Sequence, residues 1–227
     1  MRVAIVENVR NTYIGQVGVA LAEAGAEIDW LRVWKGDPLP ADPDRHDALI
    51  MFGGPQSAAD DERYPYLAEV AKLMRRFDEA GKAVLGICLG SQVLARAYGA
   101  ENRPGVAREF GVHGVQLTPE GRGDPLFAGM NDDFPVFQWH ADTFSLPEGA
   151  IRLAASAATP NQAFRIGRAA YGIQFHFEAD RAMVEAWQGS IAVPVEPQRV
   201  MKVDAAGLAI ARAWVAMVAA KRAAEVS

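Results

Sequence analysis

The single cysteine of the chain, Cys88, lies in a short pattern that suits a nucleophile. Apolar and β-branched residues at 83–87 are followed by helix-favouring residues at 92–97, which predicts a strand, a tight turn and a helix. Gly86 and Gly90 suit so sharp a turn, because a Cβ there would collide with neighbouring strands. Backbone N–H groups at the start of the helix favour a thiolate. Taken alone, the pattern fits a buried core cysteine equally well.

A cysteine nucleophile needs a base within hydrogen-bond reach and usually a third group that orients the base. The chain has four histidines. His46 lies in a charged loop and is expected in solvent, and His113 begins a predicted strand with no acid close by in the sequence. His140 lies in a loop that could line a pocket, although a structural hydrogen-bonding role fits equally well. These three histidines are the weaker candidates.

His176 is the strongest candidate for the base. It lies in a predicted strand at 170–177, where successive side chains point to opposite faces. The apolar residues Phe175 and Phe177 share the face toward the core, and the other face carries His176 and Glu178. The carboxylate can then accept the second N–H of the imidazole and fix its tautomer. A surface ion pair is the alternative, but the aromatic neighbours on both sides disfavour it.

An oxyanion hole is the remaining requirement. Gly53 and Gly54, followed by Pro55, come directly after the predicted strand at 48–52 and leave backbone N–H groups accessible. The N–H of Leu89, the residue after the cysteine, is the natural second donor. A Gly-Gly-Pro turn is common by itself, but here it stands one strand–helix unit before the cysteine. We therefore expect these groups to meet at one edge of the sheet.

The elements that position these residues alternate along the first hundred residues. Strands are predicted at 2–6, 28–34, 48–52 and 82–87. Between and after them, the sequence predicts a first helix capped by Asn11 or Thr12, a second at 64–80 and a third directly after Cys88. This order predicts an α/β fold with an open, mostly parallel central sheet and helices on both faces. Short strands at 113–117, 135–139, 151–155 and 162–166, together with 170–177, predict an appended antiparallel meander. A helix at 179–188 and a closing helix capped by Asp204 complete one domain over residues 1–227, with Trp30 and Trp34 expected in the core.

Composition narrows the class of protein. Half of the residues are hydrophobic, 22% are charged, and the formal net charge of −5 comes with no run of basic residues, which argues against a nucleic-acid partner. One cysteine excludes an internal disulfide framework and suits a reducing compartment. We find no signal peptide and no apolar run of about 18 residues, so a cytoplasmic protein without membrane contact is expected. No phosphate-binding loop or Cys/His cluster is present, so no cofactor or metal is expected.

The three motifs together resemble the class I glutamine amidotransferases. Gly53-Gly54-Pro55, the turn at 86–92 and the segment at 174–178 have the order and spacing of that family, and are most similar to stand-alone members related to the glutaminase domain of GMP synthase. The resemblance covers residues 1 to about 180 and implies the flavodoxin-like glutamine amidotransferase fold.

The same resemblance implies roles for individual residues. It implies a Cys88–His176–Glu178 triad, and oxyanion donors at Gly54 and Leu89. It also implies substrate contacts by Gln92, and Gly53 and His140 are further candidates for that role. The chain departs from the family at Phe177, where proline usually stands. Because strand alternation directs Phe177 toward the core, we expect the triad to survive this change.

Three functions remain open at this stage. The first is a glutaminase that releases ammonia from glutamine, working with a synthetase partner chain. The second is a γ-glutamyl peptidase or hydrolase whose leaving group is an amine. The third is a catalytically silent regulatory module, which the intact Cys-His-Glu set disfavours. A Cys-for-Ser α/β-hydrolase is also disfavoured, because that fold usually places its acid before its histidine.

Overall fold

The computed structural model describes residues 1–188 and 196–226. Its strands are β1 (Arg2–Val6), β2 (Glu27–Leu31), β3 (Ala48–Met51), β4 (Ala83–Ile87), β5 (Asn102–Arg103), β6 (Glu109–Leu117), β7 (Asp133–His140), β8 (Thr143–Phe144), β9 (Ile151–Ala155), β10 (Ala163–Ile166) and β11 (Ala170–Ile173). Its helices are α1 (Gly15–Glu23), α2 (Tyr66–Glu79), α3 (Leu89–Ala97), α4 (Pro119–Arg122), α5 (Arg181–Gln188) and α6 (Pro197–Val226), with 3₁₀ turns η1 (Val33–Lys35) and η2 (Pro125–Phe127).

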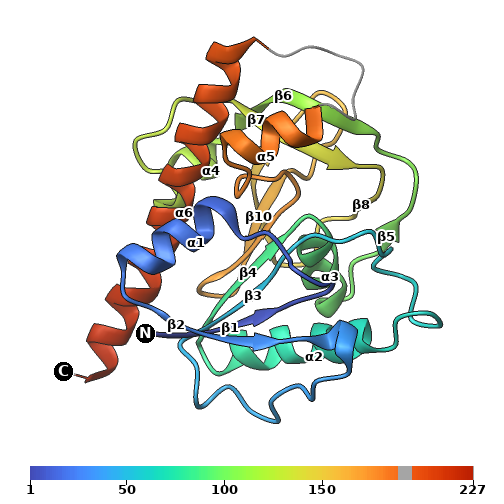
Figure 1. Cartoon of the computed structure of the whole chain (residues 1–227), viewed down its shortest axis with the longest axis vertical. Helices are drawn as coiled ribbons and strands as arrows, with labels where there is room; N and C mark the ends of the chain where they lie inside the picture. Colours follow the sequence, from blue (N-terminus) through green and yellow to red (C-terminus); the bar gives the residue numbers. More distant parts are fainter. Residues whose placement is uncertain (189–195, 227) are drawn as a thin grey trace.

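A mixed sheet forms the centre of the molecule, in the order β2-β1-β3-β4-β11-β10-β9-β6-β7 (Figure 1). The first five of these strands are parallel, and their order is that of flavodoxin-like folds. The remaining strands continue the sheet in antiparallel fashion. The expected α/β class, the parallel sheet and the appended meander are therefore confirmed.

Helices cover both faces of the sheet because its central strands are apolar on both sides. In β1, Val3 and Ile5 pack into one core with α1 and α6, whereas Ala4 and Val6 pack into a second core with α2 and α3. Figure 1 shows the same arrangement, with α1 and α6 on the side of the sheet opposite α2. The central parallel strands β1, β3, β4 and β11 therefore run largely buried between two helical layers, whereas the edge strand β2 is partly exposed. The carboxyl ends of the parallel strands meet at one edge, where such folds bind ligands.

β11 is shorter than the predicted strand at 170–177 and ends at Ile173. Its parallel neighbour β4 ends at Ile87, and the last contact between the two is the Cys88 N–H donating to the Ile173 carbonyl at 2.8 Å. Beyond Ile173 the chain no longer pairs with β4, and His176 forms only an isolated bridge to Phe137. The regular strand is thus shorter than predicted, and the segment that carries His176 and Glu178 lies beyond its end.

Two expected helix caps are also wrong. Helix α1 begins at Gly15, and its Gln16 N–H donates to the Glu178 carbonyl at 2.9 Å, so a distant segment, instead of Asn11 or Thr12, meets the helix start. Asp204 does not cap the closing helix, because it lies inside α6. Its carboxylate accepts hydrogen bonds from the Gln16 side chain and from the backbone N–H of Arg181, the first residue of α5.

One helix within residues 1–188 and 196–226 is long and apolar enough to cross a membrane by length and composition. It covers Pro197–Ala224 of α6, within which an 18-residue stretch has a mean hydropathy of 1.6. Ile210, Trp214 and Val218 of this helix are buried in the core shared with α1 and the sheet. This packing covers part of the helix, and 39% of its apolar stretch is buried.

Candidate active site

Cys88 occupies the sharp turn between β4 and α3. Its backbone has φ +50° and ψ −108°, a conformation that costs a non-glycine residue about 1–3 kcal/mol and that clusters at functional sites. The two neighbouring glycines make this turn possible: a Cβ on Gly86 would lie 2.3 Å from the Gly90 carbonyl oxygen, and one on Gly90 would lie 2.0 Å from that of Met51. The predicted strand–turn–helix is therefore present, with the cysteine at its apex.

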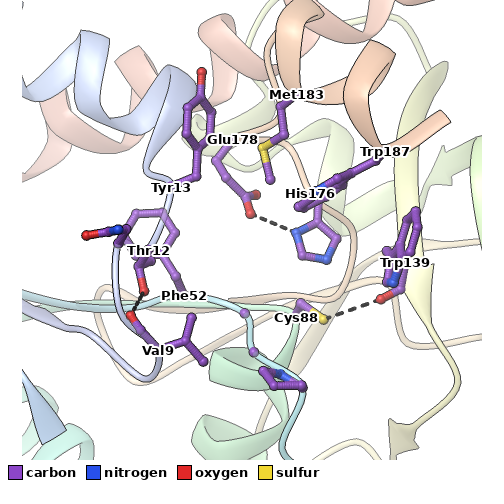
Figure 2. A pocket seen from close by; sticks show the side chains of 14 residues that line it. Val9, Thr12, Tyr13, Phe52, Cys88, Trp139, His176, Glu178, Met183 and Trp187 are labelled. Carbon is purple, nitrogen blue, oxygen red and sulfur yellow. Dashed lines mark hydrogen bonds and ion pairs between the residues drawn. The ribbon is translucent and has the colours of Figure 1, made fainter. Parts of the chain in front are cut away.

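His176 and Glu178 form a buried pair beside this turn. The imidazole Nδ1 and the carboxylate Oε1 are 2.7 Å apart, and the two side chains are 7% and 2% exposed. An N–H at Nδ1 donates to the carboxylate, which leaves Nε2 for other chemistry. Figure 2 shows the imidazole of His176 between the Glu178 carboxylate and Cys88. The segment is not a regular strand, yet Phe177 points into the core as expected and the pair is intact.

The electrostatic setting of His176 favours the imidazolium. Burial lowers the pKa of His176, but the Glu178 carboxylate and the Cys88 sulfur outweigh it and hold the pKa well above its usual value. A positively charged imidazole beside the cysteine is the state that supports a thiolate nucleophile and can supply a proton to a leaving group.

Gly53 lies against both groups. A Cβ built on Gly53 would meet His176 Cε1 at 3.0 Å and Cys88 Cβ at 3.4 Å. This glycine therefore lets the loop after β3 approach the cysteine and histidine closely. The structure thus brings together four predicted site residues, Cys88, His176, Glu178 and Gly53, from the carboxyl ends of β3, β4 and β11.

These groups line one cavity of about 420 Å³ (Figure 2). Its other lining residues are Val9, Asn11, Thr12, Tyr13, Phe52, Gly54, Pro55, Trp139, Met183 and Trp187. Leu89 is not among them, although it is the first residue of α3 and its backbone directly follows Cys88. The oxyanion role of Gly54 and Leu89 remains a prediction, supported by the place of Gly54 in the wall of the cavity.

An aromatic wall bounds the cavity on the side of His176. The Trp187 ring packs edge-on against the His176 ring, with centroids 5.0 Å apart and an interplanar angle of 83°. Trp187 also lies 5.5 Å from Trp139, and Phe137 stacks on Trp139 behind it. The sequence reasoning missed Trp187, Met183 and Tyr13 as lining residues. No local motif marks them, because they come from α5 and from the loop after β1.

Gln92 and His140 lie behind this cavity, outside its lining. The Gln92 amide donates to the Asp142 carbonyl at 3.3 Å and to Gln174 Oε1 at 3.1 Å. His140 Nδ1 lies 3.0 Å from the same carbonyl, and its Nε2 lies 3.2 Å from Glu109 Oε2. Both residues thus hold the segment after β7 in place. Their predicted direct contact with substrate remains a prediction.

Glu109 is the charged centre of this buried group. Its carboxylate also accepts from Ser156 Oγ at 2.7 Å and from Gln162 Nε2 at 2.7 Å. Burial raises the pKa of Glu109, but the interactions with His140 and Ser156 outweigh it and lower the pKa below its usual value. The carboxylate therefore stays ionised and fastens β6 to β7 next to the cavity.

The other two histidines lie away from the cavity. His46, expected in solvent, is instead buried, and its Nε2 is 2.9 Å from Asp29. His113 Nε2 contacts the Phe110 carbonyl at 2.8 Å. Across the part of the chain that the structure describes, no group of three or more His, Cys, Asp or Glu side chains could hold a metal ion.

Comparison with known proteins gives concordant results. The sequence model of the family "Glutamine amidotransferase class-I" matches residues 9–183. The glutamine amidotransferase-like protein YfeJ of Salmonella typhimurium is 37% identical over 172 residues, which cover 74% of this chain and 71% of that protein. A glutamine-hydrolysing GMP synthase of Porphyromonas gingivalis is 34% identical over 152 residues, 66% of this chain but only 28% of the synthase.

Solved structures agree with these sequence matches. A glutamine amidotransferase of Thermotoga maritima superposes with a TM-score of 0.83 at 28% identity, covering 96% of this chain and 97% of that one. A glutamine amidotransferase of Methylobacillus flagellatus gives a TM-score of 0.83 at 28% identity, covering 95% and 94%.

Proposed function

Because the chain belongs to the class I glutamine amidotransferase family, we propose that it hydrolyses the side-chain amide of glutamine through a γ-glutamyl thioester on Cys88. One observation carries the proposal: Cys88 at a strained turn, the His176–Glu178 pair at 2.7 Å and the glycines of the loop after β3 line the same cavity. A nucleophile, an oriented base and accessible backbone donors are the parts that acyl transfer requires.

In the first half of the proposed reaction, the Cys88 thiolate attacks the side-chain carbonyl carbon of glutamine. Backbone N–H groups of Gly54 and Leu89 hold the oxyanion that forms. The tetrahedral intermediate collapses with cleavage of the C–N bond, and the imidazolium of His176 donates its Nε2 proton to the departing nitrogen. The products are ammonia, a γ-glutamyl thioester and neutral His176.

In the second half, neutral His176 removes a proton from water as the water oxygen attacks the thioester. The second tetrahedral intermediate expels the Cys88 thiolate and releases glutamate, so the thiolate–imidazolium pair is restored. Glu178 holds the ring through Nδ1 in both halves and stabilises its positive charge. Gly53 bounds the site of attack, and Gln92 and His140 support the wall that contains Trp139 through the Asp142 carbonyl.

Ammonia release from L-glutamine by the purified chain tests the proposal. Cys88→Ala should abolish release while leaving the urea midpoint close to that of the parent, because the exchanged atom is one sulfur in a partly open pocket. Ser145→Ala serves as the control and should retain turnover, because the Ser145 hydroxyl accepts from the Glu101 N–H and does not line the cavity. Persistent release by Cys88→Ala at the parent rate would contradict the assignment.

A synthetase partner that consumes the ammonia belongs to the same proposal. The chain spans about a quarter of the length of the GMP synthases that it matches, and those proteins are named for glutamine hydrolysis coupled to synthesis. Turnover that rises when a candidate synthetase is added would support a subunit role. Full activity without any added chain would favour independent hydrolysis.

A further inference from the structure

A second cavity lies beside the catalytic one, also of about 420 Å³. It is lined by Glu7, Arg10, Asn11, Trp30, Arg32, Trp34 and Lys35. Trp30 lies near the end of β2, and the other residues follow β1 or β2. The cavity therefore opens at the same edge of the sheet as the cysteine, next to the point where strand order reverses. Asn11 lines both cavities, and the two therefore meet at the loop after β1.

The second cavity is cationic in a chain whose formal net charge is −5. Its lining contains three basic residues, Arg10, Arg32 and Lys35, and one acid, Glu7. Glu7 is already engaged: it accepts from the Trp34 indole at 2.7 Å and from the Asn11 N–H at 3.0 Å. Its distance to Arg32 Nε is 3.6 Å. Within residues 1–188 and 196–226, Arg10 and Lys35 have no ion-pair partner, so a ligand anion would find two uncommitted cations there.

The tryptophans give this cavity a defined wall. Trp34, expected in the core, is instead 39% exposed, and its indole N–H is fixed by Glu7. Trp30 packs partly against the core beneath it. An exposed indole held in place next to free cations is a surface that can bind the apolar stem of a ligand while its anionic end pairs with arginine or lysine.

We propose that this cavity is a leaving-group subsite, which selects γ-glutamyl compounds whose amine portion ends in a carboxylate. The proposal rests on the thioester chemistry above: the γ-glutamyl group occupies Cys88, and the amine portion extends along the wall formed by residues 9–13 toward Arg10 and Lys35. Glutamine, whose leaving group is ammonia, leaves the subsite empty. The substrate class would then be γ-glutamyl amino acids or short γ-glutamyl peptides.

The test measures binding to Cys88→Ala by calorimetry, so that no turnover is needed. The probes are γ-glutamyl-glycine and γ-glutamyl-glycyl-glycine, each compared with its C-terminal amide. The two lengths place the carboxylate about 3.5 Å apart along an extended chain. For at least one length, the carboxylate form should bind about 2- to 30-fold more tightly than the amide, the range for two exposed charge pairs. The preference should shrink as salt is raised.

Introducing Arg10→Ala and Lys35→Ala together into the Cys88→Ala protein should abolish this preference for the carboxylate form. The matched control, Lys72→Ala with Arg75→Ala, removes the same two residue types from the exposed face of α2 and should leave the preference intact. Equal binding of acid and amide at both lengths, or no binding of any probe, would overturn the subsite. A carboxylate preference in Cys88→Ala, combined with no hydrolysis by the parent, would instead refute the proposed reaction and leave the subsite standing.

Discussion

Replacing Glu178 by glutamine removes a buried negative charge from His176 while keeping a group that can accept its Nδ1 proton. The two atoms are 2.7 Å apart and both side chains are nearly inaccessible to water. At an effective dielectric constant of about 20, opposite charges about 4 Å apart attract by about 4 kcal/mol, before the cost of burial is subtracted. We therefore expect the pKa of His176 to fall when this charge is removed, because the Glu178 carboxylate is a main cause of its raised value.

This change should appear in both catalysis and stability. Loss of the oriented, charged imidazole should reduce kcat/KM for ammonia release by about 10²- to 10⁴-fold. The pKa of folded His176 is raised, so its stabilisation is complete below the pKa of an unfolded histidine, about 6.5, and disappears as pH rises through the folded pKa. The free energy of unfolding of Glu178→Gln should therefore lie furthest below that of the parent near pH 6, and the gap should narrow at alkaline pH.

The assays are an NMR titration of the His176 ring and urea unfolding across pH. Glu185→Gln is a matched control, because Glu185 lies on neighbouring α5 in an exposed ion pair with Arg181. It should alter neither the His176 titration nor the rate. An unchanged pKa of His176 in Glu178→Gln, or a rate equal to that of the parent, would show that Glu178 does not hold His176 in its charged form.

Two further changes test the supports of the site. Gly90→Ala places a Cβ about 2.0 Å from the Met51 carbonyl oxygen, so urea unfolding should show a loss of stability of about 1–3 kcal/mol or more. In the control Gly123→Ala the nearest atom to the new Cβ is 3.7 Å away, and the loss should be far smaller. Equal losses in the two variants would contradict the close packing at Gly90. Glu109→Gln removes a carboxylate whose pKa is lowered in the folded protein. The parent should therefore lose stability as pH falls through the pKa of Glu109, and the variant should lack that loss. Parallel profiles of unfolding free energy against pH in the two proteins would refute this assignment.

Much of the fold could be predicted because its signals are local. The alternation of short apolar strands with helices fixes a parallel sheet, and the Gly-x-Cys-x-Gly turn needs only the residues that it contains. The turn at Cys88 is accordingly present as expected, with the positive φ that flanking glycines allow. The core position of Phe177 followed from a strand pattern that is itself only partly present. That prediction succeeded because the chain still alternates briefly after its strand ends.

The misses share a physical cause, which is contact between segments far apart in the chain. Asn11 and Thr12 are good helix-capping residues, but the Asn11 N–H donates to Glu7, and α1 begins where Gln16 reaches the Glu178 carbonyl. His46 looks solvated among charged neighbours, yet Asp29 of β2 holds it in a buried position. Trp187 enters the cavity from α5, and no spacing relative to Cys88 could have indicated it.

Cys88 should carry a γ-glutamyl group during turnover, and intact-protein mass spectrometry of acid-quenched reactions can detect that group. With glutamine at saturating concentration, we expect a protein species heavier than the free chain by one γ-glutamyl group. This group should lie on the peptide that contains Cys88 and should be lost on treatment with hydroxylamine. Cys88→Ala should show neither this species nor ammonia. Ammonia release by the parent with the γ-glutamyl group on another residue, or undiminished release by Cys88→Ala, would contradict a Cys88 thioester mechanism.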